Sequence, residues 1–173
     1  MRNIDRLGVV KGCTVYKKNG NVTDPFPACV NAEITFPEIS HPTYTQQSTG
    51  DMEIPDQTRV NSMTTTISAP PGGRRIELSG QGVQDYIIRF ALEVERANGS
   101  FEMVPFTAYI SGVIASRGGQ SVTVGEVPTA DVTINTYRFK LQEGDKVLYN
   151  IDKLAGIVEI NGVDYRQQLN QML

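Results

Sequence analysis

Hydrophobic and polar residues alternate with a period of two along much of this chain. The clearest run spans residues 104–114, whose even positions are apolar: Val104, Phe106, Ala108, Ile110 and Ile114. Thr107, Tyr109 and Ser111 fall on the opposite face. Successive side chains of a strand point to opposite sides, so the pattern is typical of a half-buried antiparallel strand.

A second alternating run changes its parity partway along. Val132 and Ile134 are apolar at even positions, whereas Tyr137, Phe139 and Leu141 are apolar at odd positions. One regular strand cannot place both sets on one face, because a shift of one residue moves every side chain to the other side. We therefore predict a β-bulge or a bend near Asn135-Thr136. A strand that bends in this way is what the corner of an orthogonal sandwich or a barrel requires.

Asn-Gly pairs separate several of the strand-like runs. They are Asn19-Gly20, Asn98-Gly99 and Asn161-Gly162. Asn-Gly between strand-like residues is the strongest short-range signal for a two-residue hairpin with positive φ at both central positions. A further turn is indicated at Glu143-Gly144-Asp145. The chain is therefore expected to form a series of antiparallel hairpins.

These patterns place the chain in the mainly β class. Many short strands with Gly and Pro turns argue for a two-sheet antiparallel sandwich or a barrel. Helix signals are confined to residues 73–78 and to a short terminal turn at residues 166–172. Residues 40–58 form a long polar loop with little periodicity, and loops of that length are usually functional or disordered. At 173 residues we expect a single domain over residues 1–173.

Charge and hydropathy exclude several classes of function. The chain has 16 Lys and Arg against 19 Asp and Glu, and its basic residues cluster only as the pairs Lys17-Lys18 and Arg74-Arg75. A sequence-independent DNA-binding protein needs clustered basic residues to neutralise phosphates. No apolar run approaches the ~20 residues that span a bilayer, and residues 1–6 lack the apolar core of a signal peptide. We expect neither a DNA-binding surface nor a membrane anchor.

Candidate chemistry is sparse. His41 is the only histidine, so a Ser-His-carboxylate or Cys-His arrangement would have to use it, and we interpret it as a surface or interface residue. Cys13 and Cys29 are the only cysteines, and we expect free thiols rather than a bridge. A metal site would need more ligands than these. Residues 79–82 lack the Lys and the strand-to-helix setting of a phosphate-binding loop. We therefore predict no enzyme activity, no metal and no cofactor.

Residues 137–165 carry a more specific pattern. A Tyr-Arg pair is followed by a Gly, then by Ile-Asp, then by Asn-Gly-Val-Asp near the C-terminus. The motif residues are Tyr137, Gly144, Ile151, Asp152, Asn161, Gly162 and Asp164. In this order they resemble the major tail tube protein family of contractile-tailed bacteriophages. The resemblance is densest over residues 88–164 and departs from the family at residues 72–82, where the family has a longer helix.

The resemblance implies a structural role. Proteins of the family assemble as hexameric rings whose inner sheets form a closed β-barrel, and the rings stack into a hollow tube inside a contractile sheath. The implied location is a virion or a phage-tail-like particle such as a tailocin, assembled in the bacterial host cytoplasm. The implied partners are the tail sheath protein, the baseplate or tube initiator, the tape measure protein and the tail terminator, with DNA only passing through the lumen.

Two alternatives come from other classes of protein. One is the tube component of a type VI-like secretion system, which the motif at residues 151–152 and 161–164 disfavours. The other is a β-sandwich that binds carbohydrate or a receptor. Such modules usually display exposed aromatic residues on the binding face, and this chain has no Trp.

Three sets of residues are candidates for assembly contacts. For the ring-to-ring contact we expect the loop residues His41, Tyr44, Gln46, Gln47, Met52, Ile54 and Asp56. For the lumen we expect one strand face with Arg89, Glu93, Glu95, Thr107 and Tyr109. For terminal contacts with neighbours or sheath we expect Ile4, Leu7, Tyr165, Leu169 and Leu173. Acidic side chains that face the lumen would repel phosphate and keep a passing molecule from adhering.

Overall fold

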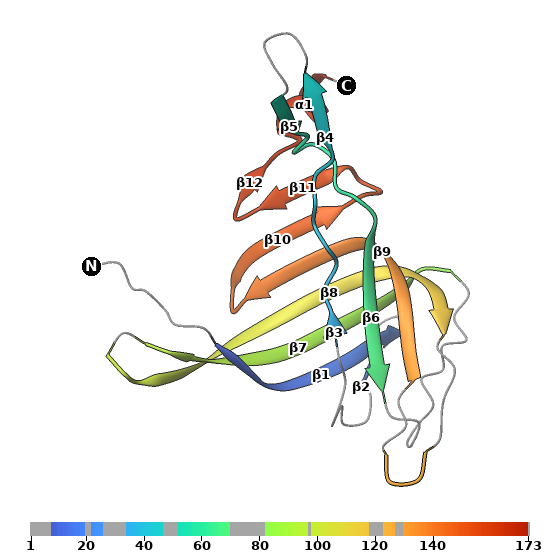
Figure 1. Ribbon diagram of the computed structural model, residues 1–173, viewed down its shortest axis with the longest axis vertical. Coiled ribbons are helices and arrows are strands. Elements are labelled where there is room, and N and C mark those ends of the chain that lie inside the picture. Colours follow the sequence, from blue (N-terminus) through green and yellow to red (C-terminus); the bar gives the residue numbers. More distant parts are fainter. Residues whose placement is uncertain are drawn as a thin grey trace.

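The structure, a computed structural model, describes residues 8–19, 22–25, 34–46, 52–69, 82–96, 98–117, 123–126 and 130–172 (Figure 1). The elements in these ranges are β1 (Val9–Asn19), β2 (Val22–Pro25), β3 (Ile34–Thr35), β4 (Thr43–Gln46), β5 (Met52–Pro55), β6 (Met63–Ala69), β7 (Gln84–Glu95), β8 (Phe101–Arg117), β9 (Ala130–Glu143), β10 (Lys146–Asp152), β11 (Ile157–Ile160), β12 (Val163–Asp164) and α1 (Gln167–Met172). The predicted class, mainly antiparallel β with one short helix, is confirmed.

In the described part of the chain, ten strands form one antiparallel sheet. Its main path runs β12-β11-β10-β9-β8-β7-β1-β2, while β6 joins at β9 and carries β3 on its other edge. Among the described strands, β4 and β5 pair only with each other. Most neighbours in the sheet are consecutive in sequence, because short turns connect antiparallel strands directly.

Strand β9 is where the sheet divides. Its residues 130–136 pair with β6 and its residues 138–143 pair with β10, while β8 runs along the opposite edge. Arg138 lies opposite Ser111, whereas Thr136 lies opposite the next residue of β8, Gly112. Tyr137 is therefore an extra residue in β9, which confirms the predicted bulge. The buried side of β9 changes parity there, from Val132, Ile134 and Thr136 to Phe139.

Because β9 bends at this bulge, β6 and β3 cross one face of β1, β7 and β8 (Figure 1). The two layers that a sandwich requires are thus two parts of one bent sheet. The core between them comes from β1, β6, β7, β8, β9 and β10: Val15, Met63, Ile67, Tyr86, Ile88, Ala108, Ile110, Val132, Ile134, Phe139 and Ile151. Ile88 and Ile134 are 0% exposed, and full burial of such a side chain contributes about 1.5–3 kcal/mol.

Hairpin turns lie at both Asn-Gly pairs that the structure describes in full, Asn98-Gly99 and Asn161-Gly162. Asn161 and Gly162 have φ angles of 51° and 80°, as predicted for the two-residue turn between β11 and β12. Residues 98–99 also lie in a hairpin, but its loop is longer, because the amide of Arg96 donates to the carbonyl of Ser100 at 2.8 Å. Asn19 pairs with Val22 and so ends β1, and residue 20 lies outside the described residues.

The predicted terminal helix is α1. Its first turn is held by the amide of Asn170, which donates to the carbonyl of Arg166 at 2.8 Å. The other segment predicted to be helical, residues 73–78, lies outside the described residues. Among the helices that the structure describes, none is long and apolar enough to cross a membrane.

Candidate assembly surfaces

The predicted polar loop contains a hairpin, which we call the arm (β4 and β5). Tyr44 lies opposite Ile54, and Gln46 lies opposite Met52. We expected irregular chain here, but Thr, Tyr and Ile favour strands and can pair locally even when the surrounding sequence is polar. The arm stands at one end of the long axis of the molecule (Figure 1). Tyr44 and Ile54 are 53% and 42% exposed, so the arm presents apolar surface to solvent.

The predicted contact residues lie in or beside this arm. Tyr44, Gln46, Met52 and Ile54 belong to its strands, and His41 and Asp56 lie just outside them, while Gln47 is outside the described residues. We call residues 40–42 and 56–61, which enter and leave the arm, the arm base. His41 Nδ1–H donates to the carbonyl of Arg59 at 2.6 Å and so connects the two halves of this base.

Main-chain hydrogen bonds hold the two halves of the arm base together. The amide of Asp56 donates to the carbonyl of Pro42 at 2.6 Å, and the amide of Asn61 donates to the carbonyl of Ser40 at 3.0 Å. The ammonium of Lys153, in the turn between β10 and β11, donates to the carbonyl of Asn61 at 2.6 Å. Partial burial lowers the pKa of Lys153. The base is thereby attached to the main sheet.

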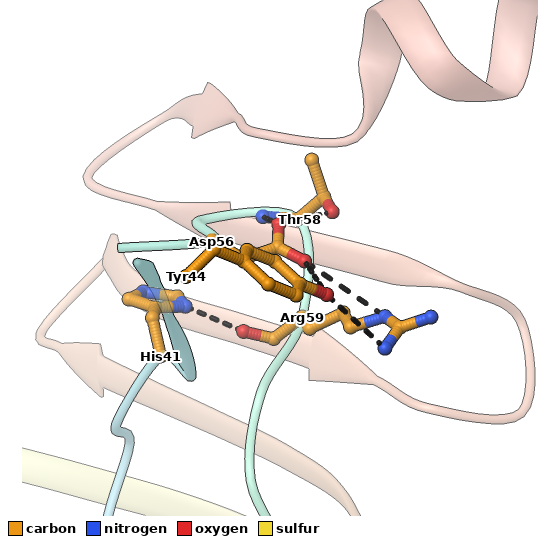
Figure 2. A network of polar contacts seen from close by, with 5 residues as sticks. All are labelled: His41, Tyr44, Asp56, Thr58 and Arg59. Atoms are coloured by element: carbon orange, nitrogen blue, oxygen red, sulfur yellow. Dashed lines mark hydrogen bonds and ion pairs between the residues drawn. The ribbon is translucent and has the colours of Figure 1, made fainter. Parts of the chain in front are cut away.

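The carboxylate of Asp56 is the centre of a polar network at the arm base (Figure 2). Its Oδ1 accepts from the amide and the hydroxyl of Thr58, at 3.0 and 2.6 Å. Its Oδ2 accepts from the Tyr44 hydroxyl at 3.4 Å and lies 3.8 Å from Nε of Arg59. Arg59 also donates to the Tyr44 hydroxyl at 3.4 Å. The hydrogen bond from the Thr58 hydroxyl is the main reason that the pKa of Asp56 lies below its usual value.

The five lumen candidates share one face of the main sheet. Strand β7 directs Tyr86 and Ile88, 1% and 0% exposed, into the core. Its odd-numbered residues therefore lie on the opposite side, as do their direct neighbours on β8. The residues of this side include all five candidates: Arg89, Glu93, Glu95, Thr107 and Tyr109. We call this side of β1, β7, β8, β9 and β10 the polar face.

Charges of both signs cover the polar face. The Lys11 ammonium lies 2.6 Å from the carboxylate of Glu93, and the Arg89 guanidinium lies 5.5 Å from the centre of the Tyr16 ring. Exposed contacts of this kind contribute only about 0–1 kcal/mol each. Their main effect is on the surface potential. Acidic side chains are present on this face, as expected, but neighbouring cations neutralise part of their charge.

Five motif residues of the family resemblance form turns, the bulge and the core. Tyr137 is the bulge residue of β9, and Ile151 is 1% exposed in the core. Gly144 has a φ of 53° in the turn between β9 and β10, and Asn161 and Gly162 make the last hairpin turn. A positive φ favours glycine because it has no Cβ.

The two motif aspartates hold turns by accepting main-chain hydrogen bonds. Asp152 Oδ1 accepts from the amides of Leu154 and Ala155 at 2.9 and 3.0 Å. Its Oδ2 lies 2.8 Å from Nε of Arg138 on β9. Asp164 Oδ1 accepts from the amide two residues further on at 2.9 Å, just before α1. Asp side chains commonly stabilise turns in this way. All seven motif residues therefore have structural roles in this chain.

The terminal candidates are described only in part. Tyr165 donates its amide to the carbonyl of Val158 at 2.9 Å, which holds the start of the C-terminal segment against β11. Leu169 lies on α1 and is 37% exposed, so its side chain is available for a contact. The other three candidates lie outside the described residues: Ile4, Leu7 and Leu173.

The described ranges contain no group of three His, Cys, Asp or Glu residues that could hold a metal ion. Cys13 is a half-buried thiol beside the core. Cys29 lies outside the described residues.

Two features were missed in the sequence. One is the network around Asp56, which the Asp-x-Thr spacing at residues 56–58 could have indicated, because Asp side chains often accept from the amide two residues on. The other is the free end of β8, where Phe101 and Met103 are 68% and 53% exposed. No local pattern marks that end, because only the register shows that β9 stops opposite Phe106.

The fold and its surfaces define a class of antiparallel β proteins with a bent, branched sheet and a projecting arm. A chain of the cryo-EM structure of an extracellular contractile injection system, the PVC sheath/tube terminator in the extended state, has this fold. It matches with a TM-score of 0.54 and 16% identity, over 80% of this chain and 99% of that chain. A chain of the PVC sheath-tube complex in the extended state matches with a TM-score of 0.47 and 16% identity, over 76% of this chain and 88% of that chain. No curated protein matches the sequence.

The family follows from the sequence itself. Residues 26–173 match the family described as phage tail tube protein FII. The match covers most of the chain, which therefore belongs to this family, and the resemblance carried by residues 137–165 is confirmed. The protein is a structural subunit of a tail tube and a component of a phage tail or a phage-tail-like particle.

Proposed function

We propose that copies of this chain pair side by side into hexameric rings, and that these rings stack coaxially into the inner tube of a contractile tail. The single observation that supports the proposed ring is an open strand edge at β8. Residues 101–104 of β8 extend past the last contacts of β8 with the hairpin of β9 and β10, where Phe106 lies opposite Glu143 and the carbonyl of Pro105 accepts from the amide of Gly144 at 3.0 Å. On that edge, no strand in the described ranges pairs with them, although β7 pairs with them on the other side.

An open edge with apolar side chains is a site for pairing with another chain. Unpaired N–H and C=O groups attract a second strand, and soluble proteins normally cover or charge such edges. Here Phe101 and Met103 are largely exposed beside the edge, and Glu102, the charged residue between them, is paired with Arg96 at 2.6 Å. A neighbouring copy that supplies a strand would satisfy the backbone, and its side chains would lie beside Phe101 and Met103, which project to the same side of the sheet as their partners Glu95 and Glu93. Repetition of this contact around a ring removes the edge by closing an inner β-barrel.

The arm is the proposed contact between rings. It lies outside the main sheet, and its exposed Tyr44 and Ile54 provide apolar surface for a subunit of the next ring. Aromatic and aliphatic anchors of this kind commonly carry most of the binding energy of an interface. The terminal segments, with Tyr165 and Leu169, are proposed to contact neighbours or the surrounding sheath.

The polar face is proposed to line the lumen. Its mixed charges give phosphate no continuous cationic surface, so DNA would pass without adhering. The subunit would carry out no chemistry of its own. The further partners that we propose are the sheath, the baseplate or tube initiator, the tape measure protein and the tail terminator. Assembly would take place in the host cytoplasm.

The test is electron microscopy of the concentrated purified protein, which we expect to show sixfold rings and stacked tubes. Met103→Lys places a charge on the open edge and should leave a folded monomer, because Met103 is exposed and outside the core. Val124→Lys is the control, since Val124 is 103% exposed and lies between β8 and β9, outside the open edge, and this variant should still form tubes. A wild-type protein that stays monomeric at millimolar concentration would overturn the proposal.

The arm has its own test. Deletion of residues 46–52 should leave a soluble, folded subunit that forms no tubes, because the arm pairs with no other strand of the described chain. Tubes of normal length from this deletion, seen by negative-stain microscopy, would refute the ring-to-ring role.

A further inference from the structure

The direction of the arm depends on its base. Within the described residues, β4 and β5 share no strand pairing with the ten-stranded sheet, so no ladder of main-chain hydrogen bonds to that sheet orients them. The chain enters at Pro42 and leaves at Asp56, and the Asp56 amide joins the two at 2.6 Å. A single hydrogen bond fixes the distance between these two residues but still allows the arm to rotate about it. It therefore acts as a hinge. Further contacts must set the angle of the arm.

The carboxylate of Asp56 supplies contacts to both sides of this hinge (Figure 2). On the arm it accepts from the Tyr44 hydroxyl of β4. On the base it accepts twice from Thr58 and faces the guanidinium of Arg59. Arg59 also donates to the Tyr44 hydroxyl, so Asp56, Tyr44 and Arg59 contact one another, and the carbonyl of Arg59 accepts from His41. Contacts from one carboxylate to Tyr44, Thr58 and Arg59 restrict rotation of the arm more than a single hydrogen bond does.

We propose that Asp56 is a positioning residue: its carboxylate fixes the angle at which the arm leaves the sheet, and assembly depends on that angle. The dependence of assembly on this angle rests on the proposed ring-to-ring role of the arm, whereas the effect of Asp56 on the angle does not. Asp56 acts here through Tyr44 and Arg59 and does not itself have to touch another copy. An arm held at the right angle loses less conformational freedom when a ring docks on it, which is the general advantage of a preorganised contact.

The geometry also predicts what stays intact when the carboxylate is removed. The main-chain bonds from Asp56 to Pro42 and from Asn61 to Ser40 use no side chain of Asp56. The Lys153 contact to the carbonyl of Asn61 is likewise independent of it. Asp56→Ala should therefore leave the base attached to the sheet and the core untouched, while the arm becomes free to rotate.

The experiment compares amide hydrogen exchange in the monomeric wild type, Asp56→Ala and Asp56→Asn. Loss of the Tyr44 contact also makes local opening of the hairpin easier, so we expect the amides of β4 and β5 to exchange about tenfold faster in Asp56→Ala, with those of β7, β8 and β9 unchanged. Asp56→Asn keeps one acceptor oxygen for Thr58 but loses the charge, so its exchange should be intermediate. Asp145→Asn, in the turn between β9 and β10, is the control for loss of an aspartate charge and should match the wild type. Equal exchange of the arm amides in all four proteins would overturn the positioning role.

The same proteins are then tested for tube formation by sedimentation and microscopy. We expect Asp56→Ala to lose tubes at a concentration at which Asp145→Asn assembles fully, with an unchanged unfolding midpoint. Faster exchange in the arm together with normal tubes would overturn the link between arm angle and assembly. If the wild type itself forms no tubes, the proposed function fails, yet the exchange comparison on monomers still tests the role of Asp56.

Discussion

Replacing Gly112 by Ala should disrupt the place where β8 crosses the bulge of β9. A Cβ built on Gly112 would lie 2.2 Å from the carbonyl oxygen of Asn135 and 2.8 Å from Cγ2 of Ile134. Non-bonded carbon atoms prefer separations of about 3.5–4.0 Å, so the strands would have to move apart by roughly an ångström. The backbone of β9 has little freedom to do so, since β6 and β8 hold it from both edges at Asn135.

The loss of folding stability in Gly112→Ala can be estimated from this geometry. Overpacked core positions lose about 1–3 kcal/mol, and occasionally more. Because the obstacle is a main-chain carbonyl in a paired strand, we expect a loss of about 3 kcal/mol. For a chain of this size that corresponds to a Tm lower by about 6–12 °C. Since Gly112 faces Thr136 across the bulge, the loss would report on the bend that divides the sheet.

The assay is thermal and urea unfolding of the monomer, with Gly12→Ala as the matched control. Gly12 lies in β1 at another irregularity of the register, but a Cβ built there meets nothing within 4 Å. This variant should stay within about 0.5 kcal/mol of the wild type. An unchanged midpoint for Gly112→Ala, or equal losses in both variants, would refute the role assigned to the close approach.

Three further perturbations follow from local geometry. Gly162→Ala should lose about 1–2 kcal/mol in unfolding experiments, since residue 162 has a φ of 80°; an unchanged stability would contradict the strain. Asp152→Ala should lose about 1–2 kcal/mol, because two amides and Arg138 lose their acceptor; a loss equal to that of exposed Asp145→Ala would refute this. The hydrogen bonds from Thr58 lower the folded-state pKa of Asp56. The stabilisation of the arm by this carboxylate is therefore fully present above the unfolded-state pKa and is lost as the pH falls through the lowered folded-state pKa. Arm exchange followed against pH, after correction for the intrinsic rate, should therefore rise only below the ordinary aspartate range; a rise between pH 7 and about 5 would contradict this assignment.

The sequence by itself determined the class, the main turns and the bulge. Alternation at residues 104–114 predicts one buried face because side chains of a strand alternate strictly, and the structure buries Ala108 and Ile110 on that face. The change of parity between Ile134 and Phe139 required an extra residue, and Tyr137 is that residue. Asn161-Gly162 specified its own turn, since few residue pairs accept two positive φ angles. These features depend on neighbours in the chain, which is why they could be predicted.

Tertiary structure alone decided how the strands share edges and which surfaces remain open. The pairing of β9 with β10 follows from the local turn at Glu143-Gly144-Asp145, whereas the pairing of β9 with β6 joins residues 61 to 73 positions apart, which no local pattern encodes. The exposed end of β8 exists because β9 stops at Glu143, opposite Phe106. The network at Asp56 likewise needs Tyr44 to be brought back across the arm. Local preferences specify conformations, whereas open edges and convergent side chains arise only when distant segments meet.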